Sequence, residues 1–341
     1  MGYLTPLDER KDKQMNTVIS ILLGILVLGG AVFAWLLVRY YRGRRKAAAL
    51  YAAMDKSRTG GGRLDLGTVG HLTILPLVDF YAAEQPAGLE TEAGVAYLIR
   101  ADDKTILFDL GFNRLMQDEP LLLRNMQRLG VDPASVDFIV NSHPHMDHLS
   151  GSKWQAVAGR LAGKPFYSTV PLERPGLTNL TVQQAQVLSP GVGTTGPLPV
   201  QLFLLGYTLE QSLVVNVAGK GLVVIVGCGH PGVERILERA SQIFQQPIYG
   251  IIGGLHLLVS GDRSGMRFPI QKWLGSAEPP WNPTGEAGVY SAIEKMKAQG
   301  IQLVSLSAHD SCEWTLGTFE RSFGENYQPL RVGEEISIAS G

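Results

Sequence analysis

The sequence is poor in cysteine, in net charge and in nucleotide-binding signatures. Its 341 residues include two cysteines, far apart, which excludes a disulfide-stabilised scaffold and fits a reducing compartment. The net charge is -1 and no long basic tract lies in the globular part, so we expect no nucleic-acid partner. Residues 191–196 are glycine-rich but contain no lysine, so they do not match a phosphate-binding loop and predict a surface turn.

One uncharged segment, residues 17–38, is dominated by Ile, Leu, Val, Ala and Gly. Its length matches the roughly 20 residues that cross a bilayer as a helix, which predicts a single-pass membrane anchor in contact with lipid. The preceding flank is balanced in charge, whereas residues 39–46 are rich in Arg and Lys. The positive-inside rule therefore places the carboxyl-terminal bulk of the chain in the cytoplasm.

A cleaved signal peptide is the competing interpretation of this segment. Residues 32–34 could serve as a small-residue cleavage site. Signal peptides, however, carry their positive charge before a shorter apolar core, which is the reverse of the order found here. The sequence therefore favours an uncleaved anchor.

The anchor divides the chain into four parts. We predict a short N-terminal tail at residues 1–16, a transmembrane helix at 17–38, a basic juxtamembrane segment and flexible tether at 39–63, and a catalytic domain at 64–341. The polar, glycine-rich residues 55–62 provide the flexible part of the tether.

Short apolar runs with β-forming residues recur through the domain, and helical patterns separate some of them. Strands are predicted at residues 72–75, 95–99, 105–108, 138–140, 202–205, 213–217 and 222–226, and helices at 119–129, 233–244 and 288–299. Two sets of strands with intervening helices indicate an α/β fold in which two sheets pack together under outer helices.

Four potential metal ligands follow the strand at residues 138–140 within six positions: His143, His145, Asp147 and His148. Imidazoles and a carboxylate suit zinc, and also iron or manganese. The end of a strand holds such side chains rigidly while a coordination position stays open. Histidines at i and i+2 can share one ion while the last two residues turn toward a neighbouring position, so the cluster predicts two metal ions in one cleft.

Three later apolar strands also end in small residues and a histidine. These histidines are His230, His256 and His309, and Cys228 stands two positions before the first of them. Six of the seven histidines in the chain thus lie at or just beyond predicted strand ends, where a site is assembled. The seventh, His71, precedes a strand and is predicted to be structural.

Taken in order, residues 106–111, 141–151, 221–232 and 252–257 resemble the metallo-β-lactamase superfamily. More narrowly, they resemble the branch named after dihydropterin ribofuranosylaminobenzene phosphate synthase. The resemblance covers nearly the whole chain after the tether and implies an αββα sandwich with a metal site along one edge. That branch closes with a His-Cys-Thr-Gly motif, whereas residues 309–312 here read His-Asp-Ser-Cys and keep only the histidine in place.

The resemblance also implies roles for individual residues. His143 and His145 would bind a first metal, and Asp147 and His148 would bind a second. Asp109 would orient the ligands or their loop from behind, as carboxylates outside the coordination sphere commonly do.

The remaining implied ligands depart from the common pattern of the superfamily. Cys228 stands where many members have a bridging aspartate, and a thiolate there favours zinc or iron. No histidine lies between His148 and His230, so His230 would supply the ligand that a more upstream histidine gives elsewhere. The last ligand is His309 or His256. His309 is favoured because it lies late in the chain beside a small-residue turn.

An open metal site predicts hydrolysis. A metal-bound water becomes a hydroxide nucleophile near neutral pH, and a metal polarises a carbonyl or phosphoryl oxygen. Asp147 would act as the catalytic residue that orients this water or accepts its proton. The leading hypothesis is a membrane-anchored hydrolase acting on a small-molecule ester, lactone or phosphoester. A pterin-related synthase and a non-catalytic metal or redox sensor are the alternatives, and the oligomeric state is open.

Residues 275–285 form a long irregular insertion after the second strand-end histidine. Trp281 lies within it, and Trp273 lies just before it. The insertion is either a substrate lid, with these side chains as platforms, or a structural loop.

Overall fold

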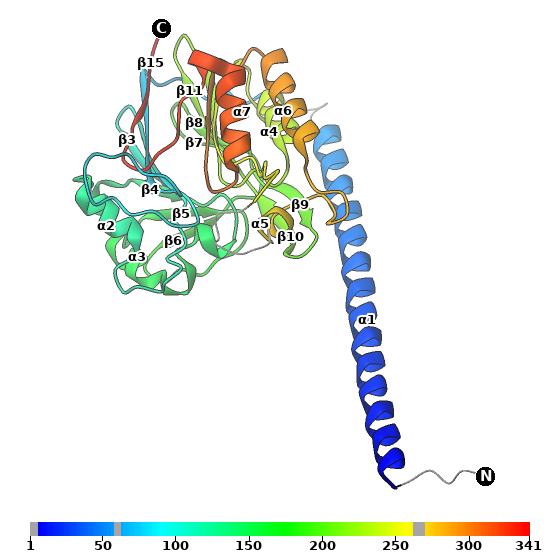
Figure 1. Cartoon of the computed structure of the whole chain (residues 1–341). Helices are drawn as coiled ribbons and strands as arrows, with labels where there is room; N and C mark the ends of the chain where they lie inside the picture. The colour runs from blue at the N-terminus through cyan, green and yellow to red at the C-terminus, as the bar shows by residue number, and fades with distance from the viewer. Residues whose placement is uncertain (1–5, 58–62, 262–269) are drawn as a thin grey trace.

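Two β-sheets face each other in the domain that follows a long N-terminal helix (Figure 1). The computed structural model describes residues 6–57, 63–261 and 270–341. The seven-stranded sheet has the order β15-β1-β2-β3-β4-β5-β6, and the six-stranded sheet has the order β14-β13-β12-β11-β8-β7. Strands β9 and β10 pair separately as a hairpin. The predicted α/β fold is confirmed as an αββα sandwich.

The first sheet is formed by β1 (His71–Val78), β2 (Ala96–Ala101), β3 (Lys104–Phe108), β4 (Phe138–Val140), β5 (Pro165–Ser168), β6 (Thr178–Thr181) and β15 (Ile336–Ala339). The second is formed by β7 (Gln186–Ser189), β8 (Val192–Thr194), β11 (Leu213–Val217), β12 (Gly221–Val226), β13 (Ile248–Gly253) and β14 (Leu303–Leu306). The separate hairpin consists of β9 (Leu198–Leu202) and β10 (Gly206–Glu210).

The α-helices are α1 (Pro6–Ser57), α2 (Leu121–Arg128), α3 (Gln155–Arg160), α4 (Val233–Ile243), α5 (Ile270–Leu274), α6 (Glu286–Ala298) and α7 (Glu313–Phe323). Short 3-10 turns are η2 (Pro133–Ser135), η3 (Met146–His148), η4 (Gly151–Lys153) and η5 (Gly324–Asn326). The predicted helices at residues 119–129, 233–244 and 288–299 correspond to α2, α4 and α6.

Alternation of side chains along the strands produces the layers. In β12, Val223 and Ile225 belong to the core between the sheets, whereas Leu222 and Val224 belong to the core under the outer helices. Successive side chains of a strand point to opposite faces, so a strand that is apolar throughout must be covered on both sides. Helices α2 and α3 cover the first sheet, and α4, α6 and α7 cover the second.

Two local predictions were wrong. The strand predicted at residues 202–205 ends at Leu202, because the chain turns there into β10 and leaves Leu204 and Leu205 exposed. The surface turn predicted at residues 191–196 contains the buried strand β8. Gly193 of β8 lies so close to Leu66 that an added Cβ would stand 2.8 Å from its Cδ1, which shows that small residues here serve tight packing.

The helix α1 includes the whole of the predicted membrane span. It is long and apolar enough to cross a bilayer, and its most apolar window is not buried by the rest of the chain. The helix continues through the basic segment as far as Ser57 and packs against the β9–β10 hairpin, where Tyr40 and Ala47 are buried. Residues 55–57 of the predicted flexible stretch are thus helical, and residues 58–62 lie outside the described part of the chain.

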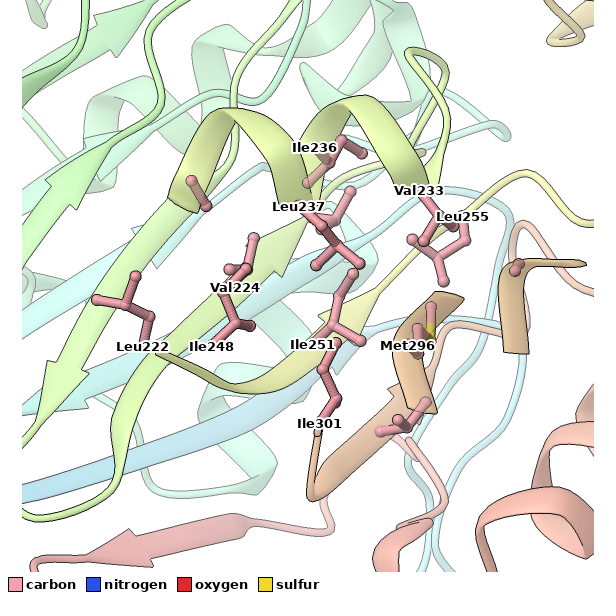
Figure 2. Packing of buried hydrophobic residues seen from close by; sticks show 14 of the residues in the cluster. Leu222, Val224, Val233, Ile236, Leu237, Ile248, Ile251, Leu255, Met296 and Ile301 are labelled. Atoms are coloured by element: carbon pink, nitrogen blue, oxygen red, sulfur yellow. The ribbon is translucent and has the colours of Figure 1, made fainter. Parts of the chain in front are cut away.

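The core under the outer helices gives a test of this packing. Leu237 of α4 is fully buried and lies over Val224 and Ile251 of the second sheet (Figure 2). The substitution Leu237→Ala should lower the free energy of unfolding by about 2–5 kcal/mol, because it removes buried methyl groups and leaves a cavity. Chemical denaturation of the detergent-solubilised protein measures this change. The exposed neighbour Glu238 supplies the control, since Glu238→Ala should change the value by less than about 0.5 kcal/mol.

Candidate metal centre

The carboxyl ends of parallel strands from both sheets meet at one edge of the sandwich. Strands β3, β4 and β5 run parallel in the first sheet, and β12, β13 and β14 run parallel in the second. The residues that directly follow these strands include all of the predicted ligands. The loop after β4, which forms the turn η3, carries the sequence cluster, and the ends of β12, β13 and β14 carry the later histidines and the cysteine.

A first group of three imidazoles forms at this edge: His143, His145 and His230. One ring nitrogen of each lies within 4.8 Å of those of the other two. The Nε2 atoms of His143 and His230 are buried and make no hydrogen bond, while their Nδ1 atoms contact Ser142 Oγ at 2.8 Å and Gly275 O at 2.7 Å. Each ring is thus held from behind with a free nitrogen facing its neighbours.

Burial keeps these imidazoles neutral. It lowers the pKa of His143 and His230 well below the usual range, and the neighbouring histidines lower it further. Burial also lowers the pKa of His145, to about 4. A histidine must be neutral to bind a metal, so the protonation state of this group already suits metal binding.

A second group contains Asp147, His148 and His309, whose ligand atoms also lie within 4.8 Å of one another. His309 Nε2 lies 3.1 Å from Asp147 Oδ2. Burial lowers the pKa of His309, but the charges of Asp310 and Asp147 outweigh this effect and raise it to about 9. Burial raises the pKa of Asp147, but the nearby histidines outweigh it and hold the pKa below its ordinary value.

Cys228 lies between these two groups. Its Sγ is 2.9 Å from His148 Nε2, and it forms further ligand groups with His143 and His148 and with His309 and Asp310. The thiol is buried, and burial together with nearby carboxylates raises its pKa well above the usual range. Cys228 thus belongs to two of the groups of potential ligands found in the described residues.

His256 lies beside the groups but joins none of those found in the described residues. Its Nδ1 is 3.2 Å from Asp310 Oδ1, its Nε2 is buried without a partner, and its backbone has a φ of 47°. Its ring centroid is 5.3 Å from that of His230. Of the two candidates for the last ligand, only His309 stands among the clustered ligand atoms.

Asp109 holds the histidine loop in place. Its fully buried carboxylate accepts hydrogen bonds from Asn141 Nδ2, from the Ser142 backbone N–H and from Ser142 Oγ, and it contacts His148 Nδ1 at 2.7 Å. Gly227 permits this arrangement, because a Cβ there would stand 2.2 Å from Ser142 Oγ. Asp109 therefore lies behind the clustered side chains and contacts one of them, His148.

Two buried carboxylates were not identified from the sequence. Glu210, at the end of β10, accepts hydrogen bonds from the backbone N–H groups of Cys228, Gly229 and His230 at 2.7–3.2 Å. Burial raises its pKa to about 7. Asp79 follows β1, and its carboxylate accepts hydrogen bonds from the His309 backbone N–H and from Ser307 Oγ, so it fixes the loop after β14.

The donor set fits divalent metal ions. The free ring nitrogens of His143 and His230 are buried and have no hydrogen-bond partner among the described residues, and an unpaired buried polar group costs free energy. Imidazole, carboxylate and thiolate are ligands that zinc and iron accept, and imidazole with carboxylate also suits manganese. The arrangement can therefore hold metal and leave room for a substrate oxygen.

A cavity of about 310 Å³ adjoins the first group. It is lined by His230 and His256, by the start of α4 and part of α6, and by residues 275–278. Gly275 lies against both histidines, because a Cβ there would stand 2.4 Å from His256 Cε1 and 2.9 Å from His230 Cε1. The insertion predicted at residues 275–285 thus contributes to the cavity wall.

Comparison with curated proteins identifies a relative across most of the chain. The chain is 26% identical over 319 residues to 7,8-dihydropterin-6-methyl-4-(β-D-ribofuranosyl)-aminobenzene-5′-phosphate synthase of Methanocaldococcus jannaschii. The match covers 81% of this chain and 99% of the relative.

Solved structures share the fold. Tm1679, described as a metal-dependent hydrolase of the beta-lactamase superfamily, superposes with a TM-score of 0.55 at 19% identity and covers 79% of this chain and all of its own. The metallo-beta-lactamase fold protein YhfI from Bacillus subtilis gives a TM-score of 0.51 at 13% identity, with the same coverage. A family model, the metallo-beta-lactamase superfamily, matches residues 89–262, which is about half of the sequence and includes most of the clustered residues. The chain therefore belongs to the metallo-beta-lactamase superfamily.

Proposed function

We propose that this protein is a membrane-anchored, metal-dependent hydrolase that acts on an ester, lactone or phosphoester. The observation that carries the proposal is the pair of adjoining ligand groups beside a cavity large enough for a small molecule. Two metal ions held in adjoining groups could stabilise the attacking and leaving oxygens of a displacement. Zinc is the proposed metal, and iron and manganese are the alternatives.

In the proposed assignment, His143, His145 and His230 would hold the first ion, and Asp147, His148 and His309 would hold the second. Cys228, which lies between the two groups, would add a thiolate, and metal binding would release the protons of His309 and of this thiol. This assignment rests on the two groups of convergent ligand atoms. His256, whose Nδ1 is occupied by Asp310, faces the cavity as a polar group for the substrate.

The metals, when bound, would supply Lewis acidity toward a substrate oxygen and make water acidic enough to react near neutral pH. The protein supplies the remaining chemistry. Asp147 stays ionised because its pKa is low, and its Oδ2 can orient a water molecule by accepting a hydrogen bond from it. Asp109 and Glu210 keep the ligand loops rigid, so the ligands need little rearrangement during the reaction.

The named activity of the relative supports a second candidate. A synthase that joins a pterin precursor to a ribofuranosylaminobenzene phosphate would use the same clustered ligands, and the relative aligns over nearly its whole length. One site serves many reactions in folds of this kind, so the relative's name has less weight than the geometry of the site. A metal or redox sensor without turnover is the third candidate.

The hydrolase is tested by metal analysis and by assays on generic phosphodiester, lactone and thioester substrates. The purified protein should contain metal and turn over at least one class, and His145→Ala should remove one ligand and abolish turnover. The exposed His71, which contacts Ser337 Oγ far from the ligand groups, gives the control His71→Ala. Bound metal without turnover on any class would favour the sensor, and turnover of the pterin precursors alone would favour the synthase.

Asp109 provides a test of the ligand support. Asp109→Asn replaces one accepting oxygen with an NH₂ group that cannot accept the bonds from Ser142 or His148. The metal affinity should fall by about 10–100-fold, as measured by competition with a chelator. The exposed Asp103 allows the same chemical change outside the site, and Asp103→Asn should leave the affinity unchanged. Equal affinities for the two variants would show that Asp109 does not support the ligands.

We also propose that α1 spans the membrane once, with the domain in the cytoplasm. The exposed apolar part of α1 and the basic residues that follow it support this topology. The full chain should stay with membranes after an alkaline wash, and a fluorescent reporter fused after Gly341 that folds only in the cytoplasm should be active. A reporter active only outside the cytoplasm would reverse the orientation, and release by the wash would contradict the anchor.

A further inference from the structure

An apolar tip projects from the domain toward the long helix. We call it the hairpin tip: Leu204 and Leu205 at the turn between β9 and β10, together with Trp281, packed on the buried Phe203. Leu205 and Trp281 are about half exposed, at 50% and 54%, although large apolar side chains are usually covered. The ring centroids of Phe203 and Trp281 are 5.7 Å apart, so the two segments form one patch.

The hairpin tip lies against α1 inside the apolar span. The Phe33 ring is 6.4 Å from those of both Phe203 and Trp281. Phe33 precedes Arg39, the first basic residue after the span, by six positions, which corresponds to about 9 Å along a helix. The tip therefore lies at the boundary between the apolar span, which Phe33 represents, and the first basic residue, Arg39. Figure 1 shows β9, β10 and α5 beside the carboxyl-terminal part of α1, while the rest of the helix extends away from the domain.

Hydrogen bonds from α1 fix the position of the hairpin tip along the helix. The Arg39 guanidinium donates to Phe203 O at 2.9 Å and to Leu204 O at 2.6 Å. Tyr40 is fully buried, and its hydroxyl donates to Ala277 O at 2.7 Å. These bonds satisfy backbone carbonyls of the turn and of the loop before Trp281, so the two segments keep their level relative to the helix.

We propose that the hairpin tip is a lipid-contact surface that sits in the interfacial layer of the bilayer. The proposal rests on the proposed membrane anchor, since the span sets the level of the lipid. Tryptophan with apolar neighbours suits the boundary between headgroups and acyl chains. Four exposed basic residues lie just beyond this level on α1, where they meet lipid phosphates: Arg42, Arg44, Arg45 and Lys46. In this arrangement the bilayer covers the apolar patch, and its phosphates neutralise the four basic residues beside the patch.

The surface connects with the candidate metal centre through one loop. Ala277, which accepts the hydrogen bond from Tyr40, lines the cavity beside His230. Two positions earlier, Gly275 O contacts His230 Nδ1. The loop at residues 275–281 therefore runs from a contact with the predicted ligand His230 to Trp281 in the proposed lipid-contact surface.

Spin-label accessibility in the full chain, reconstituted into phosphatidylcholine vesicles with anionic lipid, tests the surface. Three single-cysteine additions carry the nitroxide: Val27→Cys in the apolar span, Leu205→Cys in the tip, and Tyr290→Cys on α6. All three positions are exposed in the protein. The native Cys228 and Cys312 are buried, and their background labelling is subtracted with the unsubstituted chain.

The labels at Val27 and Leu205 should collide several-fold more with oxygen, which dissolves in lipid, than with a water-soluble nickel chelate. The label on α6 should show the opposite preference. A nickel-accessible label at Leu205 together with a lipid-exposed one at Val27 would overturn the surface and leave the anchor intact. Nickel access at Val27 would overturn the anchor itself. An immobilised label at Leu205 that neither reagent reaches would show that another protein, such as a second copy of the chain, covers the tip.

Trp281 gives an independent measurement if a label disturbs the tip. Quenching by lipids brominated on their acyl chains should be weaker for Trp281→Phe than for the unsubstituted chain, since one lipid-exposed indole is lost. Trp314→Phe, on the partly buried α7 side chain, should leave the quenched fraction of the emission equal or greater. Equal losses of quenching for the two variants would contradict lipid contact at the tip.

Discussion

The buried carboxylate of Asp109 is the interaction on which the candidate centre depends. It sits at the end of β3 with a φ of 61°, a backbone conformation unusual for a residue other than glycine. Four hydrogen bonds end on its two oxygens, and their donors are the three residues Asn141, Ser142 and His148. Asp109 thereby fixes Asn141 and Ser142, which follow β4 and precede the cluster, and the imidazole of His148, the last residue of the cluster. A buried charge is tolerated only when it is paired in this way, which is why so many polar groups converge on it.

Much of the fold could be predicted because its signals are local. An apolar strand buried on both faces, such as β12, is legible from a short window of sequence, and so is the uncharged span within α1. The metal cluster was equally clear, since four potential ligands within six positions after an apolar strand are typical of a metal site. The sequence was less able to decide between His309 and His256 as the last ligand, because both follow apolar strands. The structure shows that His309 lies among the clustered ligand atoms.

The parts that escaped prediction depend on contacts between distant segments. Glu210 looks like a polar residue at the end of a hairpin strand, and nothing nearby indicates that it accepts three backbone bonds from residues 228–230. Asp79 lies 230 positions from His309, whose backbone it binds. The hairpin β9–β10 was misjudged because Phe203, Leu204 and Leu205 continue the apolar run of β9 in sequence, although the chain reverses there and they face α1 or the surface.

The contact between α1 and the domain changes what the N-terminal segment does. The helix continues without a break past Tyr40, which is buried against the domain and bonded to Ala277, and Lys46 stacks over Tyr207 of β10 at 4.3 Å. Because Ala277 belongs to the loop that also contacts His230, any rotation of α1 relative to the sandwich would move the cavity wall. The helix therefore acts as part of the scaffold of the candidate centre, and the geometry of the first ligand group depends on a segment about 190 positions away in the sequence.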